Sequence, residues 1–224
     1  MARKSSRKSR SGLSRKQKME VKKIASEVVD AEIEDKRNVF ITENVQLFHN
    51  KPLYVGKLLA NVQQGVTTGD DNSSKTNRVG DQISLKNANI RFWLSNKLDR
   101  PNCMYKGILF WYPVDSTLSD ALVYLTQTNK MLDRYNYKSI QIVDTFILKS
   151  TQMYLNGTEK FEHSYLASLN KTYKNKKIQY QNNSTKTKSH ELGFALAVYD
   201  AYGTLQTDNI ASCAYNIQLT FQDA

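Results

Sequence analysis

The segment from Tyr215 to Gln222, with the sequence YNIQLTFQ, decides the fold class of this chain. Its apolar residues, Tyr215, Ile217, Leu219 and Phe221, alternate with four polar residues. Successive side chains of a β-strand point to opposite faces, so this alternation predicts a strand with one buried face and one polar face. A sheet that is buried on only one face is typical of antiparallel β-proteins.

Similar short runs occur along most of the chain before this segment. Residues 192–198 alternate in the same way, and 107–112 is a continuous apolar run ended by Pro113, which is typical of a strand buried on both faces. The other expected strands are 39–48, 54–62, 80–95, 139–149, 164–171 and 177–181, of which 54–62, 164–171 and 177–181 are the least defined. These runs indicate eight or so strands. Because no helical pattern connects them, we predict an all-β antiparallel sandwich or barrel, with a single eight-stranded antiparallel jelly roll as the leading version.

The expected strand 80–95 changes its apolar parity partway along. Ile83 and Leu85 fall on odd positions, whereas the later apolar residues fall on even positions: Ala88, Ile90, Phe92 and Leu94. A strand with one buried face cannot change parity while it remains regular. We therefore predict a β-bulge or a bend near Lys86 and Asn87.

Two connecting segments have features of their own. Residues 63–77 are rich in Gly, Ser and Asn, which indicates a loop, but they lack the Gly-Lys-Ser/Thr ending of a nucleotide-binding loop. Asp70 and Asp71 in this loop are interpreted as solvated acids, with a divalent ion held between subunits as the less favoured alternative. Residues 119–126 are expected to form a turn or two of helix in a long surface excursion.

Most of the net charge lies in the first 23 residues. They contain ten basic residues and one acid, Glu20, which gives +9 of the formal +11 and leaves 22 basic and 20 acidic residues in the remaining 201. The ten basic residues are Arg3, Lys4, Arg7, Lys8, Arg10, Arg15, Lys16, Lys18, Lys22 and Lys23. A block of this kind favours binding to nucleic-acid phosphates, or nuclear localisation, over a solvated tail without function.

Helical spacing begins within this basic block. The apolar residues that recur at this spacing are Val21, Ile24, Ala25, Val28 and Ala31. They predict an amphipathic helix over about 14–35, basic at its start and acidic at its end, which we expect to order on binding an anionic partner. The chain is thus predicted to have two parts, a basic, partly helical N-terminal arm (1–35) and a jelly-roll domain (36–224).

Residues suited to catalysis or metal binding are few. No two of His49, His163 and His190 are within four positions of each other, and Cys103 and Cys213 have no His or Cys neighbours at metal-ligand spacing. We interpret the two cysteines as reduced small hydrophobic residues. We expect no catalysis, no metal and no cofactor and, because no long apolar run occurs, no insertion into a membrane.

Four aromatic residues are candidates for stacking on unpaired bases: Trp93, Trp111, Tyr105 and Tyr112. Aromatic side chains in strands more often belong to a core or an interface. We favour the core or interface interpretation for these four.

Several motifs occur in an order that covers most of the chain. They are Gln64-Gly65, Arg78-Val79-Gly80-Asp81-Gln82-Ile83-Ser84-Leu85-Lys86, Asp133-Arg134-Tyr135, Tyr199-Asp200-Ala201-Tyr202-Gly203 and the terminal Leu219-Thr220-Phe221-Gln222-Asp223-Ala224. Together they resemble the capsid (coat) proteins of circular, Rep-encoding single-stranded DNA viruses, the circovirus-like or CRESS-DNA viruses. The basic residues between Arg3 and Lys23 stand where that family has its own basic arm.

The resemblance implies a single jelly roll that assembles with itself, in about 60 copies, into a small T=1 icosahedral shell. It also implies an inward-directed arm whose ten basic residues bind a packaged circular single-stranded DNA genome. Entry into the host nucleus through the import machinery, and locations in the virion and the host nucleus, follow from the same resemblance. The host-cell receptor is unknown.

Two alternatives stay open at this point. One is the coat protein of a satellite virus that packages RNA, because nothing in the sequence distinguishes ribose from deoxyribose. The other is an all-β nucleic-acid-binding protein that forms no capsid. This second alternative requires a basic groove in the body of the protein, whereas the net charge of the body is nearly zero.

Overall fold

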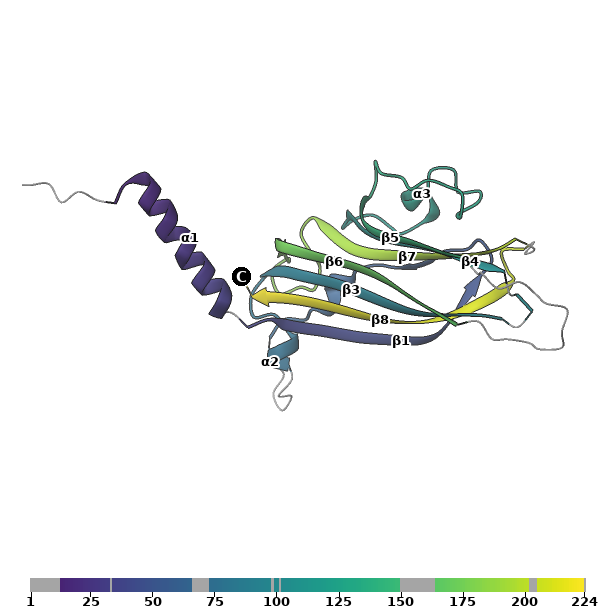
Figure 1. Ribbon diagram of the computed structural model, residues 1–224, viewed down its shortest axis with the longest axis horizontal. Helices are drawn as coiled ribbons and strands as arrows, with labels where there is room; N and C mark the ends of the chain where they lie inside the picture. Colours follow the sequence, from purple (N-terminus) through teal and green to yellow (C-terminus); the bar gives the residue numbers. More distant parts are fainter. Residues whose placement is uncertain are drawn as a thin grey trace, which may run out of the picture. The chain divides into compact units, whose positions relative to one another are not determined.

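Eight strands form two four-stranded antiparallel sheets (Figure 1). The strand order is β1-β8-β3-β6 in one sheet and β2-β7-β4-β5 in the other. The strands are β1 (Lys36–Phe48), β2 (Leu53–Val55), β3 (Gln82–Asn96), β4 (Cys103–Pro113), β5 (Gln141–Lys149), β6 (Ser164–Gln179), β7 (His190–Asp200) and β8 (Asn209–Asp223). This computed structural model describes residues 13–32, 34–65, 73–97, 99–100, 102–149, 164–201 and 205–223.

The strand order identifies a jelly roll. Each sheet combines strands from the two halves of the chain, with β1 beside β8 in one sheet and β2 beside β7 in the other. All pairings between neighbouring strands are antiparallel. This is the arrangement of two Greek keys folded into two facing sheets, so the predicted fold class is confirmed.

Short helices lie in the connections of the jelly roll, and one longer helix precedes it. They are η1 (Leu58–Asn61), α2 (Ser73–Thr76), α3 (Asp120–Val123) and α1 (Arg15–Glu32). The chain separates into two compact units, 1–34 and 35–224, so α1 belongs to the first and all eight strands to the second. The predicted functional division between an arm and a jelly-roll domain stays a prediction. No helix in the described residues is long and apolar enough to cross a membrane.

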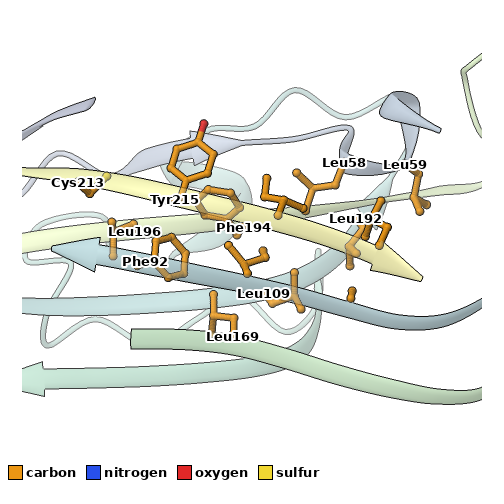
Figure 2. Packing of buried hydrophobic residues seen from close by; sticks show 14 of the residues in the cluster. Leu58, Leu59, Phe92, Leu109, Leu169, Leu192, Phe194, Leu196, Cys213 and Tyr215 are labelled. Atoms are coloured by element: carbon orange, nitrogen blue, oxygen red, sulfur yellow. The ribbon is translucent and has the colours of Figure 1, made fainter. Parts of the chain in front are cut away.

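The alternating segment at the end of the chain forms β8 and faces the main core. Tyr215, Ile217, Leu219 and Phe221 are buried between the sheets, as the sequence predicts. Figure 2 shows Tyr215 beside Phe194 of the opposite sheet, and their ring centroids lie 5.2 Å apart. Close contact between aromatic rings of the two sheets thus fixes how the inner faces pack.

The predicted irregularity in β3 is confirmed as a β-bulge. The register of β3 shifts between Leu85 and Asn87 against both of its neighbours, β6 and β8. On either side of the bulge the apolar residues are buried in the same core. The extra residue therefore restores the buried face after the change of parity.

The prediction of two short strands at 164–171 and 177–181 is wrong, because both segments belong to the single strand β6. Asn87 pairs with Thr172 and Leu85 pairs with Lys176, so three residues of β6, 173–175, lie opposite Lys86 alone. This irregular pairing, together with the many lysines, removes the alternation by which a strand is recognised. The weak segment 54–62 contains only the short strand β2, followed by η1.

The excursion between β4 and β5 does more than lie on the surface. It contains α3, whose N-terminus is capped by Ser119, the side chain of which accepts a hydrogen bond from the Leu122 N–H. The excursion also builds a second, smaller core against the outer faces of β4 and β7, formed by Ile108, Phe110, Tyr112, Val123, Tyr124, Ile140 and Ala195. For this reason β4 is buried on both faces, as its continuous apolar run predicts.

Candidate nucleic-acid interface

A reciprocal cap fixes the start of α1. The Ser14 N–H donates to Oε1 of Gln17 at 3.0 Å, and the Gln17 N–H donates to Oγ of Ser14 at 3.3 Å. This is a capping box, which satisfies backbone N–H groups that have no partner within the helix. The predicted helix is therefore present, and it begins within one residue of the predicted start.

Basic and apolar side chains occupy opposite sides of α1. Five of the ten predicted nucleic-acid-binding residues lie on α1 and are exposed: Arg15, Lys16, Lys18, Lys22 and Lys23. At about 100° per residue they fall within an arc roughly 160° wide, on the side away from Ile24. Val21, Ile24 and Val28 form an apolar stripe on the other side, each at least half exposed. One helix thus presents a face for anions and a face for apolar surface.

The charges of α1 oppose the dipole of its backbone. The first turn contains no acidic residue and the last turn contains no basic residue. Arg15, Lys16 and Lys18 instead stand at the positive N-terminal end, where cations are unfavourable and anions are favourable. A polyanion bound to the start of α1 would remove this unfavourable interaction.

The other five predicted binding residues, Arg3, Lys4, Arg7, Lys8 and Arg10, lie outside the described residues. The role of all ten residues in binding nucleic acid stays a prediction.

Of the four candidate stacking residues, the structure leaves one accessible. Trp111, Tyr105 and Tyr112 are buried, and the hydroxyls of Tyr105 and Tyr112 are used in hydrogen bonds with Asn96 and with the Lys57 N–H. Trp93, in contrast, is 59% exposed on the outer face of β3. The interpretation as core residues therefore holds for three of the four.

Trp93 belongs to an exposed apolar patch on the outer face of the β1-β8-β3-β6 sheet. Leu166 lies directly opposite it on β6 and is 78% exposed. Val39 and Ile41 are also exposed on the same sheet, on β1, which β8 separates from β3. Beside Trp93 the bulge of β1 at Asn44 opens a hollow of about 220 Å³. Exposed apolar groups gathered on one face are suited to contact with another protein surface.

The lysines of the jelly roll are strongly clustered. Six of them lie in β6 or in the connection from β6 to β7, and the sequence contains no acid between Glu162 and Glu191. They are Lys171, Lys174, Lys176, Lys177, Lys186 and Lys188. The expectation of a nearly neutral body after residue 23 is therefore incomplete, because its sum includes five acids of residues 24–35. Residues 36–224 contain 22 basic and 15 acidic residues, and the lysine cluster is a local excess of positive charge.

The residues considered for catalysis or metal binding are not brought together. His49 is buried, and its Nδ1 accepts a hydrogen bond from the Asp200 N–H, whereas His190 is exposed at the start of β7. No group of three or more possible metal ligands occurs in the parts of the chain that the structure describes. His163, Asp70 and Asp71 lie outside those parts. That the chain is no enzyme stays a prediction.

Cys103 and Cys213 are both free and buried in the main core. Burial raises the pKa of each thiol to about 12, because the charged thiolate is poorly solvated there. Both cysteines therefore behave as small hydrophobic residues, as the sequence indicates.

Arg78 begins the longest of the sequence motifs described above, Arg78–Lys86, and its position in the structure is not apparent from the sequence. Its side chain is fully buried and stacks on Tyr180, with 4.0 Å between the guanidinium carbon and the ring centroid. It donates to the carbonyls of Gly80 and Ser184 and forms an ion pair with Asp81 at 3.3 Å. Arg78 thus joins the connection before β3 to the connection after β6.

Comparisons with known proteins give similarities at the level of whole structures only. No family model and no curated protein matches the sequence. A structure of Desmodium yellow mottle tymovirus matches with 10% identity and a TM-score of 0.35, covering 85% of this chain and 88% of that chain. A structure of turnip yellow mosaic virus matches with 13% identity and a TM-score of 0.34, covering 86% and 82%. A second structure of this virus, determined at 100 K, gives 11% identity and a TM-score of 0.31, with coverage of 86% and 94%.

All three matches are virus structures, but identities and TM-scores this low establish neither a family nor a function. The fold assignment rests on the strand order and register described above. None of the three names a circular single-stranded DNA virus, so the resemblance to that family stays a prediction.

Proposed function

We propose that this chain is a viral capsid protein, whose jelly roll is the building block of a closed shell and whose arm binds the packaged nucleic acid. The observation that carries the proposal is the separation of features between the two units. A separate unit whose helix carries a basic face precedes a jelly roll (36–224) with 22 basic and 15 acidic residues, a much lower density of net charge than that of residues 1–23. Jelly rolls of this kind are common building blocks of viral shells, although a fold alone does not define a function.

Exposed apolar surface supports self-association. The patch around Trp93 and Leu166 lies in the jelly roll, and the stripe around Ile24 lies on α1. Neighbouring copies in a shell can bury apolar surface of this kind. The partner we propose for these surfaces is therefore the chain itself.

The resemblance supports a more specific form of this proposal. In this form, about 60 copies assemble into a T=1 shell that encloses circular single-stranded DNA, and the arm directs entry into the nucleus. Nine net charges in the first 23 residues of each copy give roughly 540 positive charges inside such a shell, each able to neutralise one phosphate. A genome of more than about a thousand nucleotides would need small cations to screen the remaining phosphates. Binding would then be independent of base sequence and would weaken steeply with salt.

Electron microscopy of the purified, recombinantly expressed protein tests the proposal. We expect closed particles of uniform size, and treatment with nuclease followed by extraction should recover protected nucleic acid. Digestion of the extract with deoxyribonuclease or ribonuclease separates the DNA form of the proposal from a satellite-virus form that packages RNA. A protein that stays monomeric at both low and high salt would contradict the capsid role.

A second candidate function is an all-β nucleic-acid-binding protein that forms no shell. The observation in its favour is the lysine cluster, because this function requires a basic surface in the body of the protein. Sedimentation of the protein with a single-stranded oligonucleotide distinguishes the two candidates. A small complex of fixed stoichiometry supports this candidate, and particles of several dozen copies support the capsid protein.

A further inference from the structure

A cleft opens at one end of the jelly roll, in the middle of the lysine cluster. Its volume is about 150 Å³, and it lies where β6 and the start of β7 meet β4 and β5. The side chains that decide its chemistry are Trp111, Gln141, Lys176, Lys177, Ser189 and His190. The five residues other than Trp111 have amide, ammonium, hydroxyl or imidazole groups that can donate hydrogen bonds to an anion in the cleft.

Trp111 forms part of the wall of the cleft and is not accessible for stacking on a base. It is only 4% exposed, and its indole N–H donates to the hydroxyl of Tyr173 at 3.2 Å. The ammonium of Lys176 lies 5.2 Å from the centre of the indole ring. This cation–π contact holds one positive charge of the cleft in a defined position.

The positive charge around the cleft is only slightly compensated. Lys174, Lys177 and Lys188 are exposed, and within the described residues the one ion pair of the cluster joins Lys186 to Asp115. Glu191, which follows His190 in β7, is buried and accepts hydrogen bonds from the N–H and the hydroxyl of Thr187. Burial raises the pKa of the Glu191 carboxyl, because its charged form loses solvation there. The six lysines of the cluster, with one ion pair among the described residues, leave an excess of positive charge around the cleft.

The cleft lies at the end of the jelly roll where the chain enters from the arm. Ile83 pairs with Ile178 of β6 on one side and with Asp223 of β8 on the other. Asp223 in turn forms an ion pair with Lys36, the first residue of β1, at 2.6 Å. The junction with the arm and the lysines of β6 thus share one end of the sandwich (Figure 1).

We propose that this cleft binds the phosphodiester backbone of single-stranded nucleic acid, as a second contact in addition to the arm. The inference rests on the proposed function and adds a site within the jelly roll itself. Lysine ammonium groups with neighbouring hydroxyl, amide and imidazole donors recognise phosphate, and the indole of Trp111 is buried and unavailable for stacking on bases. Nucleic acid is favoured over a sulfated glycan, which carries similar anionic groups, because the basic arm joins the jelly roll at this end.

The test compares two full-length double variants that each remove two exposed lysines. Lys177→Gln with Lys188→Gln removes two positive charges at the cleft. The matched control, Lys97→Gln with Lys149→Gln, removes two positive charges from exposed positions away from the cleft, directly after β3 and at the end of β5. The measurement is the affinity for a fluorescent single-stranded oligonucleotide over a range of salt concentrations. The slope of log affinity against log salt should fall in magnitude by roughly 1.4 for the cleft variant, which corresponds to two lost phosphate contacts. The slope of the matched control should equal that of the unchanged protein.

Equal slopes for the cleft variant and the unchanged protein, or an equal fall in the control, would overturn the proposal. Lys177→Arg with Lys188→Arg should keep the full slope, which separates lost charge from damage to the fold. Weaker binding of the cleft variant to heparin, with an unchanged slope for the oligonucleotide, would assign the cleft to a sulfated glycan and also overturn the proposal. Particle formation, followed by electron microscopy of the same variants, reports separately on the capsid role.

Discussion

Two buried cations hold the long connections of the jelly roll in place. Arg78 joins the connections before β3 and after β6. Lys106, within the apolar run of β4, donates to the carbonyls of Lys130, Met131 and Asp133 in the excursion that follows β4. Burial lowers the pKa of the Lys106 ammonium, because its charged form loses solvation. The sequence shows both residues but not their roles, since their partners are carbonyl groups elsewhere in the chain.

The role of Arg78 predicts a large loss of stability in Arg78→Met. The change leaves the carbonyls of Gly80 and Ser184 without their buried donor, and it removes the partner of Asp81. We expect the free energy of unfolding to fall by about 2–4 kcal/mol, measured by denaturant titration of the purified protein. Arg91→Met, at an exposed position of β3, is the control and should change the free energy by less than about 0.5 kcal/mol. An equal change in the free energy of unfolding for the two substitutions would show that the buried contacts of Arg78 do not stabilise the fold.

At the scale of elements, the pattern of apolar residues predicts strands with regular pairing and fails where the pairing is irregular or the contacts are distant in sequence. The alternation in β8 and the change of parity in β3 predict one strand and one bulge, and both are present. β6 is missed as a single strand because its pairing is irregular and its second half is rich in lysine. The second core is missed as well, because its excursion packs against residues of β4 and β7 that are distant in sequence.

The capping box of α1 predicts that Ser14→Ala loosens the helix. Loss of the hydroxyl that accepts from the Gln17 N–H should cost about 1 kcal/mol. We expect amide hydrogen exchange in the first turns of α1 to become about fivefold faster in the full-length protein, followed by mass spectrometry. Ser14→Thr keeps an oxygen in the capping position and should exchange nearly as slowly as the unchanged protein.

An added single-stranded oligonucleotide should slow hydrogen exchange in α1 of both variants, because phosphate at the basic first turn interacts favourably with the helix dipole. Exchange that is equal in all variants, with and without oligonucleotide, would contradict this account of α1.

At the scale of the whole molecule, the proposed function divides two roles between parts of the chain: the basic arm binds nucleic acid, and the jelly roll packs against copies of itself and adds a second contact through its cleft. The sequence predicts the arm, because ten basic residues within 23 are visible without a structure. It does not predict the cleft, because the lysines of β6 and the donors at the start of β7 come together only through the turn between those strands. It also does not separate Trp93 from the other three aromatic residues, since exposure depends on which face of its sheet each occupies.

The most direct test of this division of roles compares particles formed by the full-length chain with particles formed by a chain that lacks residues 1–23. The measurement is the amount of nuclease-protected nucleic acid per particle, determined together with electron microscopy of the same samples. The account predicts that both chains form closed shells, and that protected nucleic acid falls by more than half in the truncated chain because ten of its cations are lost. Closed shells of the truncated chain that protect as much nucleic acid as those of the full-length chain would contradict it.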